Sequence, residues 1–408
     1  MSRIISLEQL EELRIKPAFE RYMEAAERII GQVRSEGDKA LRELTKRFDG
    51  VELESFMVDR EEMRRAYERF PHSPVLKRLA RRIKWVESRL LRRLRFSERT
   101  PDGFKVTMTP RPLNSVGCYI PGGLARYPST MLMATVPAKV AGVSRVAAFT
   151  PPPADDATLA AAYIAGVDEL YLIGGAQAIA AMAYGTESIK PVDKIVGPGG
   201  GYVAAAKLLV SRDVSIDFPA GPTELLVIAD GGQRPGEIVR ELMSQAEHSP
   251  DTMVGLLTTS EKLARQVDKL LPETASRVPR GEIILESWRR NGFISVCGSM
   301  DEAVETADRI APEHLSIFSG KAGEIAGKVR NAGIISVNSP SVLSDYVIGV
   351  SHILPTWRWA RVRGGLSIID FIKLVYVVNA PRRAIKGVEK DLKTLSMIED
   401  LPNHGEAV

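Results

Sequence analysis

Residues 145–173 contain the run Arg145-Val-Ala-Ala-Phe-Thr150, the turn Pro-Pro-Pro-Ala-Asp-Asp156, an alanine-rich segment to Gly166 and a second apolar run to Ile173. Short apolar runs bounded by proline and glycine predict strands, and the turn before the alanine-rich segment predicts the start of a helix. A strand, a helix and another strand in succession are typical of a parallel sheet flanked by helices. This stretch therefore favours an α/β fold.

The same alternation extends outward from this stretch over most of the chain. Strands are predicted at Arg145–Thr150, Glu169–Ile173, Lys194–Val196, Glu224–Ala229, Met253–Leu257, Phe293–Cys297, Leu315–Phe318 and Ile334–Val337. They form two similar blocks, and 408 residues are more than one core usually organises, so two α/β units are predicted.

The regions before these blocks are helical by pattern. Residues 20–48 predict two consecutive helices that meet at Gly37-Asp38. Residues 76–99 predict one long helix with ten Lys or Arg and two Glu. A nucleic-acid interface would use such a face, but a solvated helix face is the favoured interpretation because few aromatic residues are interleaved.

Composition narrows the class of protein. Hydrophobic residues make up 44% of the chain, the net charge is +4, and the only cysteines are Cys118 and Cys297. Because no Cys-x-x-Cys pair occurs, neither a disulfide framework nor a thiolate zinc site is indicated. The apolar run Met131–Val143 is interrupted by Pro137 and Lys139, so we expect no signal peptide, no membrane span and a cytoplasmic protein.

Glycine-rich turns lie between the predicted strands. They are Gly117–Gly123, Gly174–Gln177, Gly197–Gly201 and Pro219–Thr223. Glycine lets the backbone approach a ligand closely, although each turn taken alone is adequately explained as a turn. None has the Gly-x-Gly-x-x-Gly fingerprint, but four turns at strand ends favour a nucleotide site at the carboxyl edge of a sheet.

Polar residues with acid/base or metal-binding chemistry cluster in a few short segments. Gln245 and His248 lie three residues apart at the end of a predicted helix before Pro250, so both side chains are expected on one face. A hydrogen-bonded pair and a metal site both fit this spacing. Glu313-His314 could supply two separate acid/base groups, and Asp345 and His352 add a carboxylate and an imidazole; satisfied structural roles remain the alternative.

Several longer motifs resemble the histidinol dehydrogenase family and follow the family's order over most of the chain. They are Val116-Gly-Cys-Tyr-Ile-Pro-Gly-Gly123, Gly174-Gly-Ala-Gln-Ala-Ile-Ala180, Pro219-Ala-Gly-Pro-Thr-Glu224, Ser244-Gln-Ala-Glu-His248, Ala311-Pro-Glu-His-Leu315, Ser344-Asp-Tyr346 with His352-Ile-Leu-Pro355, and Gly365-Leu-Ser367. The tail Glu399-Asp-Leu-Pro-Asn-His404 is a shorter match.

The resemblance implies a role for each matching residue. The implied zinc ligands are Gln245, His248, Asp345 and His404, with one zinc ion per subunit; the catalytic pair is Glu313 and His314; the substrate contacts are Thr223, Gln245, His248, His314, Asp345, His352, Glu399 and His404; and the NAD contacts are Tyr119, Gln177 and position 200. This chain departs from the family at position 200, because Gly200 stands where the family usually has Asn.

The resemblance also implies the architecture. It predicts two incomplete Rossmann-like α/β domains with parallel sheets, plus N- and C-terminal helical arms that form an intertwined homodimer. The expected boundaries are an N-terminal arm at 1–20, a first domain at 21–117 and 225–366, a nucleotide-binding domain at 118–224, and a C-terminal arm at 367–408 that reaches the partner subunit.

The implied activity is the NAD-dependent oxidation of L-histidinol through the aldehyde to L-histidine, the last steps of histidine biosynthesis, with two NAD reduced. In it, His314 removes the alcohol proton and Glu313 activates water for the second oxidation. A zinc-dependent hydrolase would use the same metal ligands without needing the glycine turns. A nucleic-acid-binding protein would use the helix at 76–99, and we expect neither a nucleic-acid partner nor a membrane.

Overall fold

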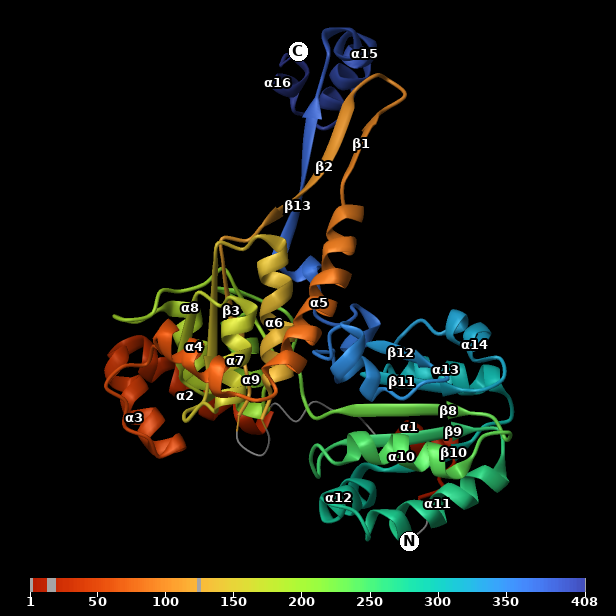
Figure 1. The fold of residues 1–408 in the computed structure, drawn as a ribbon. Coiled ribbons are helices and arrows are strands. Elements are labelled where there is room, and N and C mark those ends of the chain that lie inside the picture. Colours follow the sequence, from red (N-terminus) through yellow and green to blue (C-terminus); the bar gives the residue numbers. More distant parts are fainter. Residues whose placement is uncertain (1–2, 13–19, 123–125, 408) are drawn as a thin grey trace.

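The computed structural model describes residues 3–12, 20–122 and 126–407, and Figure 1 shows two lobes with a narrow arm rising from between them. Parts of the predicted N-terminal arm (1–2 and 13–19), and Gly123 of the first glycine turn, lie outside the described residues. Each lobe contains a five-stranded sheet, and the arm contains a three-stranded sheet. The predicted α/β class with two parallel sheets is therefore confirmed.

The first lobe has the sheet order β5-β4-β3-β6-β7, with all neighbours parallel. Its strands are β3 (Ser115–Tyr119), β4 (Arg145–Thr150), β5 (Glu169–Leu172), β6 (Lys194–Val196) and β7 (Ser215–Ile216). One face is covered by α6 (Pro128–Ala141) and α7 (Asp156–Ala165), with α4 (Arg60–Arg69) and α5 (Ser73–Arg93) outside them. The other face is covered by α8 (Gly175–Tyr184) and α9 (Gly201–Val210), with α2 (Glu20–Glu36) and α3 (Asp38–Asp49) beyond. Because it is covered on both faces, β4 is apolar and buried from Val146 to Phe149.

The packing of α2 to α5 corrects the domain boundaries drawn from the sequence. Residues 21–117 were grouped with 225–366, but Leu41 shares a core with Ile179 of α8, and Ile83 shares a core with Met131 of α6. These helices therefore belong to the first lobe. An amphipathic pattern identifies the buried stripe of a helix but carries no information about which sheet the stripe covers.

The second lobe has the sheet order β10-β9-β8-β11-β12, which is also all parallel. Its strands are β8 (Glu224–Ala229), β9 (Met253–Thr258), β10 (Phe293–Val296), β11 (His314–Phe318) and β12 (Ile334–Val337). One face packs against α10 (Pro235–Ala246), α11 (Glu261–Ala275) and α12 (Gly281–Asn291), and the other against α1 (Leu7–Glu12), α13 (Met300–Ile310) and α14 (Ala322–Lys328). Both sheets follow one winding pattern, in which the first strand lies centrally, as in doubly wound folds.

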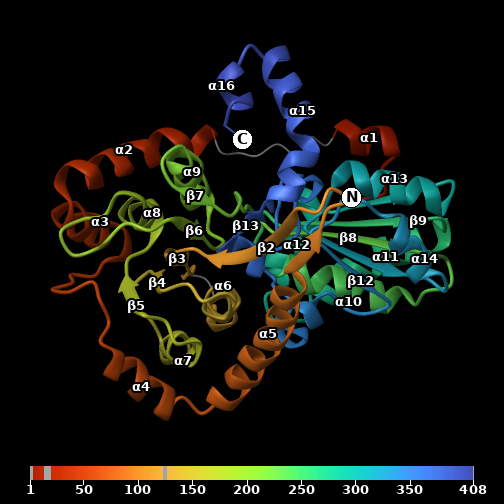
Figure 2. The ribbon, with the colours of Figure 1, turned by 90° about the horizontal axis from the view of Figure 1, so that it is seen from above.

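The N-terminal segment pairs with the edge of the second sheet. Ile4 forms a parallel bridge with Ile294, and the Ile5 amide donates to the Ile294 carbonyl at 2.9 Å. Residues 3–6 therefore extend the second sheet beyond β10 within the same chain. Figure 2 shows α1 beside α13 on this lobe.

The arm contains β1 (Phe96–Arg99), β2 (Lys105–Pro112), β13 (Ile372–Asn379), α15 (Arg382–Ile398) and α16 (Pro402–Gly405). Its strands pair antiparallel in the order β1-β2-β13. The predicted helix at 76–99 is thus too long, because α5 ends at Arg93 and residues 96–99 form a strand. The sequence analysis predicts no strand in the arm, where β2 pairs both with its neighbour β1 and with β13 from near the other end of the chain.

Three short helical turns complete the fold: η1 (Ser344–Ile348, a π-helix), η2 (Trp359–Arg361) and η3 (Ile368–Phe371). Among the described residues, no helix is both long enough and apolar enough to cross a bilayer.

Candidate active site between the lobes

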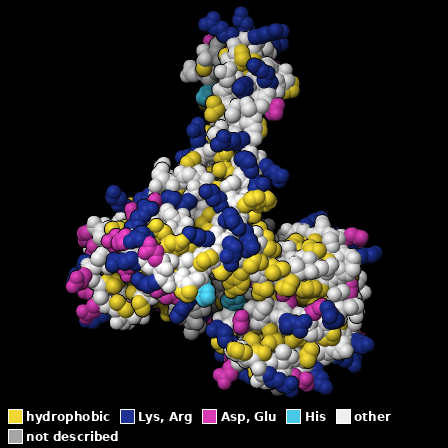
Figure 3. Space-filling model, in the orientation of Figure 1, with side chains coloured by type: hydrophobic (Ala, Val, Ile, Leu, Met, Phe, Trp, Pro, Cys, Tyr) yellow, Lys and Arg dark blue, Asp and Glu magenta, His cyan; other side chains and the backbone are white. Residues whose placement is uncertain are grey.

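A cleft of about 1840 Å³ lies between the two lobes and is lined by residues of both. In Figure 3 histidine side chains are visible where the lobes meet. The first lobe presents the carboxyl ends of its strands, since the Gly197–Gly201 turn follows β6. The second lobe presents amino ends, because Pro219–Thr223 precedes β8 and Glu313 precedes β11. Pro219–Thr223 thus lies at an amino edge, whereas Gly197–Gly201 lies at the carboxyl edge at which a nucleotide site is expected.

Three of the four implied metal ligands lie at this cleft: Gln245, His248 and Asp345. Gln245 lies in the last turn of α10, and its Nε2 donates to Asp345 Oδ2 at 2.9 Å. His248 lies just past the helix end, and its amide donates to the Gln245 carbonyl at 3.1 Å. A second bond, from Gln245 Nε2 to Ser341 Oγ at 3.1 Å, fixes the amide between the two segments.

Asp345 is presented by the π-helical turn η1, an element that often occurs at functional sites. Gly349 ends this turn with φ +93°, and a Cβ there would lie 2.6 Å from the backbone carbon of Arg82. The turn is thus pressed against α5, where only glycine fits. Asp345 is 7% exposed, and within the described part of the chain its Oδ1 has no hydrogen-bond partner.

His352 is held in place on both sides of its ring. Its Nδ1 lies 2.8 Å from the Asp345 carbonyl oxygen, and its Nε2 lies 2.9 Å from Thr130 Oγ1 at the start of α6. Burial lowers the pKa of His352, and it also lowers the pKa of His248. Neutral imidazoles are the form that binds metal ions or accepts protons.

Glu313 and His314 are brought to the cleft by the end of α13 and the start of β11. Both are buried, at 7% and 3% exposure. Burial raises the pKa of Glu313 well above its usual range and lowers the pKa of His314 to about 4. His314 Nε2 lies 3.9 Å from Asp345 Oδ1, and its Nδ1 has no partner among the described residues. A neutral imidazole with a free nitrogen beside a carboxyl group can accept a proton from a bound ligand.

Glu224 is a buried carboxyl group to which the sequence analysis gave no role, although it ends one of the quoted motifs. Its backbone amide donates to Glu313 Oε2 at 2.9 Å, and its own Oε1 accepts from the Trp357 amide at 2.8 Å. Burial raises the pKa of Glu224 to about 7. Because β8 and β11 are neighbours in the sheet, the two glutamates start adjacent strands. That adjacency is invisible in a sequence where they lie 89 residues apart.

The residues implied to contact NAD occupy two environments. Gly200 lies in the cleft wall at the N-cap of α9, with φ −66° and, among the described residues, no atom within 4 Å of where a Cβ would stand. Tyr119 and Gln177 are buried beneath the neighbouring turns, at 4% and 1% exposure. The Gly175 amide donates to the Tyr119 hydroxyl at 3.0 Å, and Gln177 Oε1 has no partner among the described residues.

The implied substrate contacts also divide into two groups. Thr223 lines the cleft at the entry to β8. Glu399 and His404 are located at the end of α15 and in α16, at the tip of the arm in Figure 1, and do not line the cleft of their own chain. Within the described residues, α15 makes its main contacts with α16 rather than with either lobe.

The chemistry of the cleft fits a zinc ion. An amide oxygen, an imidazole and a carboxylate are suitable ligands, and Asp345 Oδ1 is a buried carboxyl oxygen without a hydrogen-bond partner in the described residues. Across the described residues, no group of three His, Cys, Asp or Glu is gathered at one point. Gln245, His248 and Asp345 would therefore form an incomplete set that needs a further ligand.

Comparison with known proteins adds independent information. The family model described as histidinol dehydrogenase matches residues 13–408. The chain is 44% identical over 387 residues to a histidinol dehydrogenase of Methanothermobacter thermautotrophicus, covering 93% of this chain and 91% of that protein. It is 41% identical over 389 residues to one of Geobacillus kaustophilus, covering 93% and 91%. The crystal structure of histidinol dehydrogenase from Elizabethkingia anophelis superposes with a TM-score of 0.89 at 32% identity, covering 94% of this chain and 90% of that one.

Proposed function

Since the chain belongs to the histidinol dehydrogenase family and is an oxidoreductase of histidine biosynthesis, we propose that its cleft uses zinc and NAD to oxidise L-histidinol through the aldehyde to L-histidine. The proposal is supported by the observation that three groups of residues meet in one cleft. They are the Gln245, His248 and Asp345 set, the Glu313-His314 pair, and the Gly197–Gly201 turn. NAD and L-histidinol bound next to each other between the lobes would contact all three groups of residues.

Zinc and NAD would each supply one kind of chemistry. Zinc would hold the imidazole and amine of the substrate, and NAD would accept the hydride at both steps. Gln245, His248 and Asp345 would hold the metal. The hydrogen bonds of Gln245 to Asp345 and Ser341 pre-position two of these side chains before a ligand arrives. Thr223 and His352 would contact the substrate, and Gly200 would lie against the nucleotide.

The proton transfers are assigned to Glu313 and His314. His314 is neutral near pH 7 because burial lowers its pKa to about 4, so it can accept the alcohol proton in the first oxidation. Glu313 would take a proton from the water that attacks the aldehyde. Burial raises the pKa of Glu313, which makes its ionised form a stronger base, and the Glu224 amide orients the carboxylate at 2.9 Å.

A second copy of the chain would complete the site. Strand β13 exposes Leu374, Tyr376 and Val378, and the end of α15 exposes Met397 and Ile398. An extended arm with this much exposed apolar surface is typical of an interface that is covered in the assembly. We infer a homodimer in which Glu399 and His404 of each arm complete the metal and substrate contacts of the other subunit.

The decisive experiment measures NADH formation from L-histidinol by absorbance, with and without a chelator. We expect two NADH per histidinol, loss of activity with the chelator, and recovery on adding zinc. The alternative, a zinc-dependent hydrolase, would yield no NADH. An absence of NADH formation by the folded, zinc-loaded protein would contradict the proposal.

A further inference from the structure

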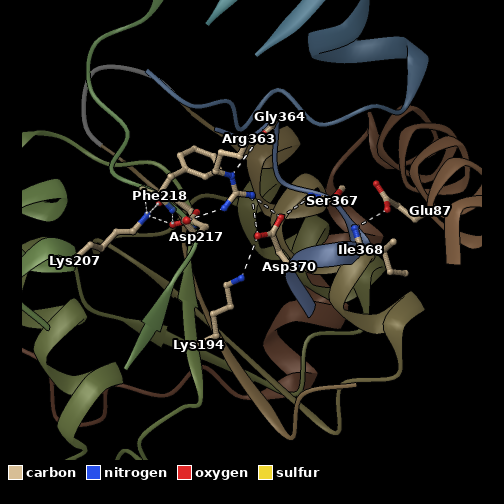
Figure 4. A network of polar contacts seen from close by, with 11 residues as sticks. Glu87, Lys194, Lys207, Asp217, Phe218, Arg363, Gly364, Ser367, Ile368 and Asp370 are labelled. Atoms are coloured by element: carbon tan, nitrogen blue, oxygen red, sulfur yellow. Dashed lines mark hydrogen bonds and ion pairs between the residues drawn. The ribbon is translucent and has the colours of Figure 1, made fainter. Parts of the chain in front are cut away.

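A fully buried ion pair lies directly beneath the cleft wall of the first lobe. Lys207 of α9 pairs with Asp217, which follows β7, and their side chains are 1% and 0% exposed. Figure 4 shows both side chains, with Phe218 and Arg363 beside them. Burial lowers the pKa of Lys207, and the neighbouring Asp217 charge acts in the opposite direction. Burying two charges costs free energy that is offset only when the charged groups make further hydrogen bonds. The backbone groups that accept or donate these bonds show which segments the pair holds in place.

The pair takes up both backbone polar groups of Gly197. Lys207 Nζ donates to the Gly197 carbonyl at 2.8 Å, and the Gly197 amide donates to Asp217 Oδ2 at 2.8 Å. Gly197 has φ +115°, and a Cβ at this position would lie 2.1 Å from the Tyr119 carbonyl oxygen. The first residue of the Gly197–Gly201 turn is therefore clamped between strand β3 and the ion pair.

The same pair holds a second segment of the cleft. Lys207 Nζ also donates to the Phe218 carbonyl at 2.8 Å, and the Phe218 amide donates to Asp217 Oδ1 at 2.6 Å. Phe218 immediately precedes Pro219–Thr223, the loop that carries Thr223 into the cleft. One ammonium group thus bridges the carbonyls at the roots of two cleft segments, which lie 21 residues apart in the sequence.

Arg363 supports this cluster from the segment that leads to the arm. Its guanidinium donates to the Asp217 carbonyl at 2.7 Å and to Asp370 at 2.8 Å, and lies 4.4 Å from the centre of the Phe218 ring. The ion pair therefore has little room to rearrange. A change at Lys207 should be transmitted to the two cleft segments rather than absorbed locally.

We propose that Lys207 and Asp217 are positioning residues that hold the Gly197–Gly201 turn and the Pro219–Thr223 loop at a fixed separation, so that nucleotide and substrate are placed together. This inference rests on the proposed use of NAD and L-histidinol in the cleft. Neither side chain touches a ligand, because both are buried behind the turns that do. Their effect is exerted through backbone carbonyls and amides.

The test compares Lys207→Met, Asp217→Asn and the double variant. Each single change leaves a buried charge unpaired and should lower the melting temperature. The double variant has no unpaired charge, so its melting temperature should be higher than that of either single variant, although the Gly197 and Phe218 carbonyls still lack their shared donor. We expect its KM for both NAD and L-histidinol to rise at least about tenfold, with kcat changed less.

A matched control exists in the same sheet. Arg145 pairs with Glu169 and donates to the carbonyls of Pro191 and Lys190, but at the opposite, amino-terminal edge. Arg145→Met should therefore lower stability without changing either KM. Calorimetric titration with NAD, which needs no turnover, is measured for every variant and should show the same weakening as KM.

The outcomes separate the two proposals. A wild-type protein that forms no NADH from L-histidinol contradicts the proposed function. The titration with NAD still tests the positioning role of Lys207 and Asp217. Wild-type NAD affinity and wild-type KM values in a folded double variant would overturn the positioning role of Lys207 and Asp217. An equal rise of KM in Arg145→Met would also overturn it, because the effect would then be a general loss of stability.

Discussion

Glu313 and His314 are adjacent in the chain, yet burial acts on their protonation in opposite directions. It raises the pKa of the carboxyl group and lowers that of the imidazole, so the neutral form of each is favoured. Neutral His314 can accept the alcohol proton directly, whereas Glu313 must first ionise, and its raised pKa makes the carboxylate the stronger base for taking a proton from water. The division of roles proposed for the pair follows from this asymmetry.

Replacing Glu313→Gln tests the division directly. Because only the second oxidation needs an activated water, the variant should oxidise L-histidinol to the aldehyde but lose about 100-fold or more in oxidising the aldehyde. The measurement is NADH formation with L-histidinaldehyde supplied directly. His314→Gln is the companion variant and should slow the first oxidation. Wild-type turnover of the aldehyde by Glu313→Gln would remove Glu313 from this role.

Gly200 is a position where the chain can accept the side chain that its family usually has. Its φ of −66° suits any residue, and open space surrounds the position of a Cβ. Gly200→Asn should tighten NAD binding by about 1 kcal/mol through one added hydrogen bond. Calorimetric titration measures the change, with Gly200→Ala as the control. If Asn binds NAD no more tightly than Ala, the side chain makes no contact with the nucleotide.

At the scale of elements, a buried carboxyl group joins α5 to the base of the arm. Glu87 of α5 is 3% exposed, and its Oε2 accepts from the Ile368 amide at 2.8 Å. Figure 4 shows this contact beside Asp370, which pairs with Lys194 and Arg363. Burial, with a smaller contribution from the Asp370 charge, raises the pKa of Glu87 to about 7.

This raised pKa predicts a pH-dependent stability. A folded-state pKa above the usual 4.5 means that the folded chain holds the proton more tightly, so stability declines as pH rises from 4.5 through about 7. Glu87→Gln keeps an acceptor for Ile368 and removes the titration. It should be more stable than wild type at about pH 8, by up to about 3 kcal/mol, and equal to it at about pH 4.

Thermal unfolding at the two pH values checks the prediction for Glu87. Replacement of the exposed Glu54 by Gln is the control and should leave the pH dependence unchanged. A stability difference between Glu87→Gln and wild type that is the same at both pH values would show that Glu87 does not titrate in this range.

At the scale of the whole molecule, the arm carries two residues of the proposed site away from the cleft of its own chain. Figure 1 shows α15 and α16 at the end of β13, clear of both lobes. An own-chain site would require this tail to fold back, and in the described residues α15 packs mainly on α16. The geometry favours delivery of His404 to a second subunit.

Mixing inactive subunits distinguishes a shared site from an own-chain site. His248→Ala and His404→Ala should each be inactive, but a crossed dimer has one intact and one doubly broken site. Random reassociation should therefore restore about one quarter of wild-type activity. Mass spectrometry confirms that mixed dimers have formed. No recovery in verified mixed dimers would mean that each tail serves its own subunit.

The α/β class, the eight strands predicted in the two blocks and the list of candidate site residues could all be predicted from the sequence. A strand that is covered on both faces is apolar on both faces, so it appears in the sequence as a short apolar run such as the one within Arg145–Thr150. Such a run can be recognised without knowing the rest of the fold. Motif residues are likewise identified from their immediate neighbours in the sequence. The sequence does not predict strand β3, because its glycine and cysteine resemble a turn, although Gly117 lies in the sheet, where a Cβ would meet Met182.

The tertiary structure alone decided which residues meet. Gln245 donates a hydrogen bond to Asp345, 100 residues further along the chain, and Glu313 accepts one from the Glu224 amide, 89 residues away. It also decided that α2 to α5 cover the first sheet, that Tyr119 and Gln177 lie beneath the cleft wall, and that Lys207 reaches the roots of two loops. Local patterns fix burial and element type, whereas these contacts depend on how separate elements pack, and periodicity contains no record of the packing partner.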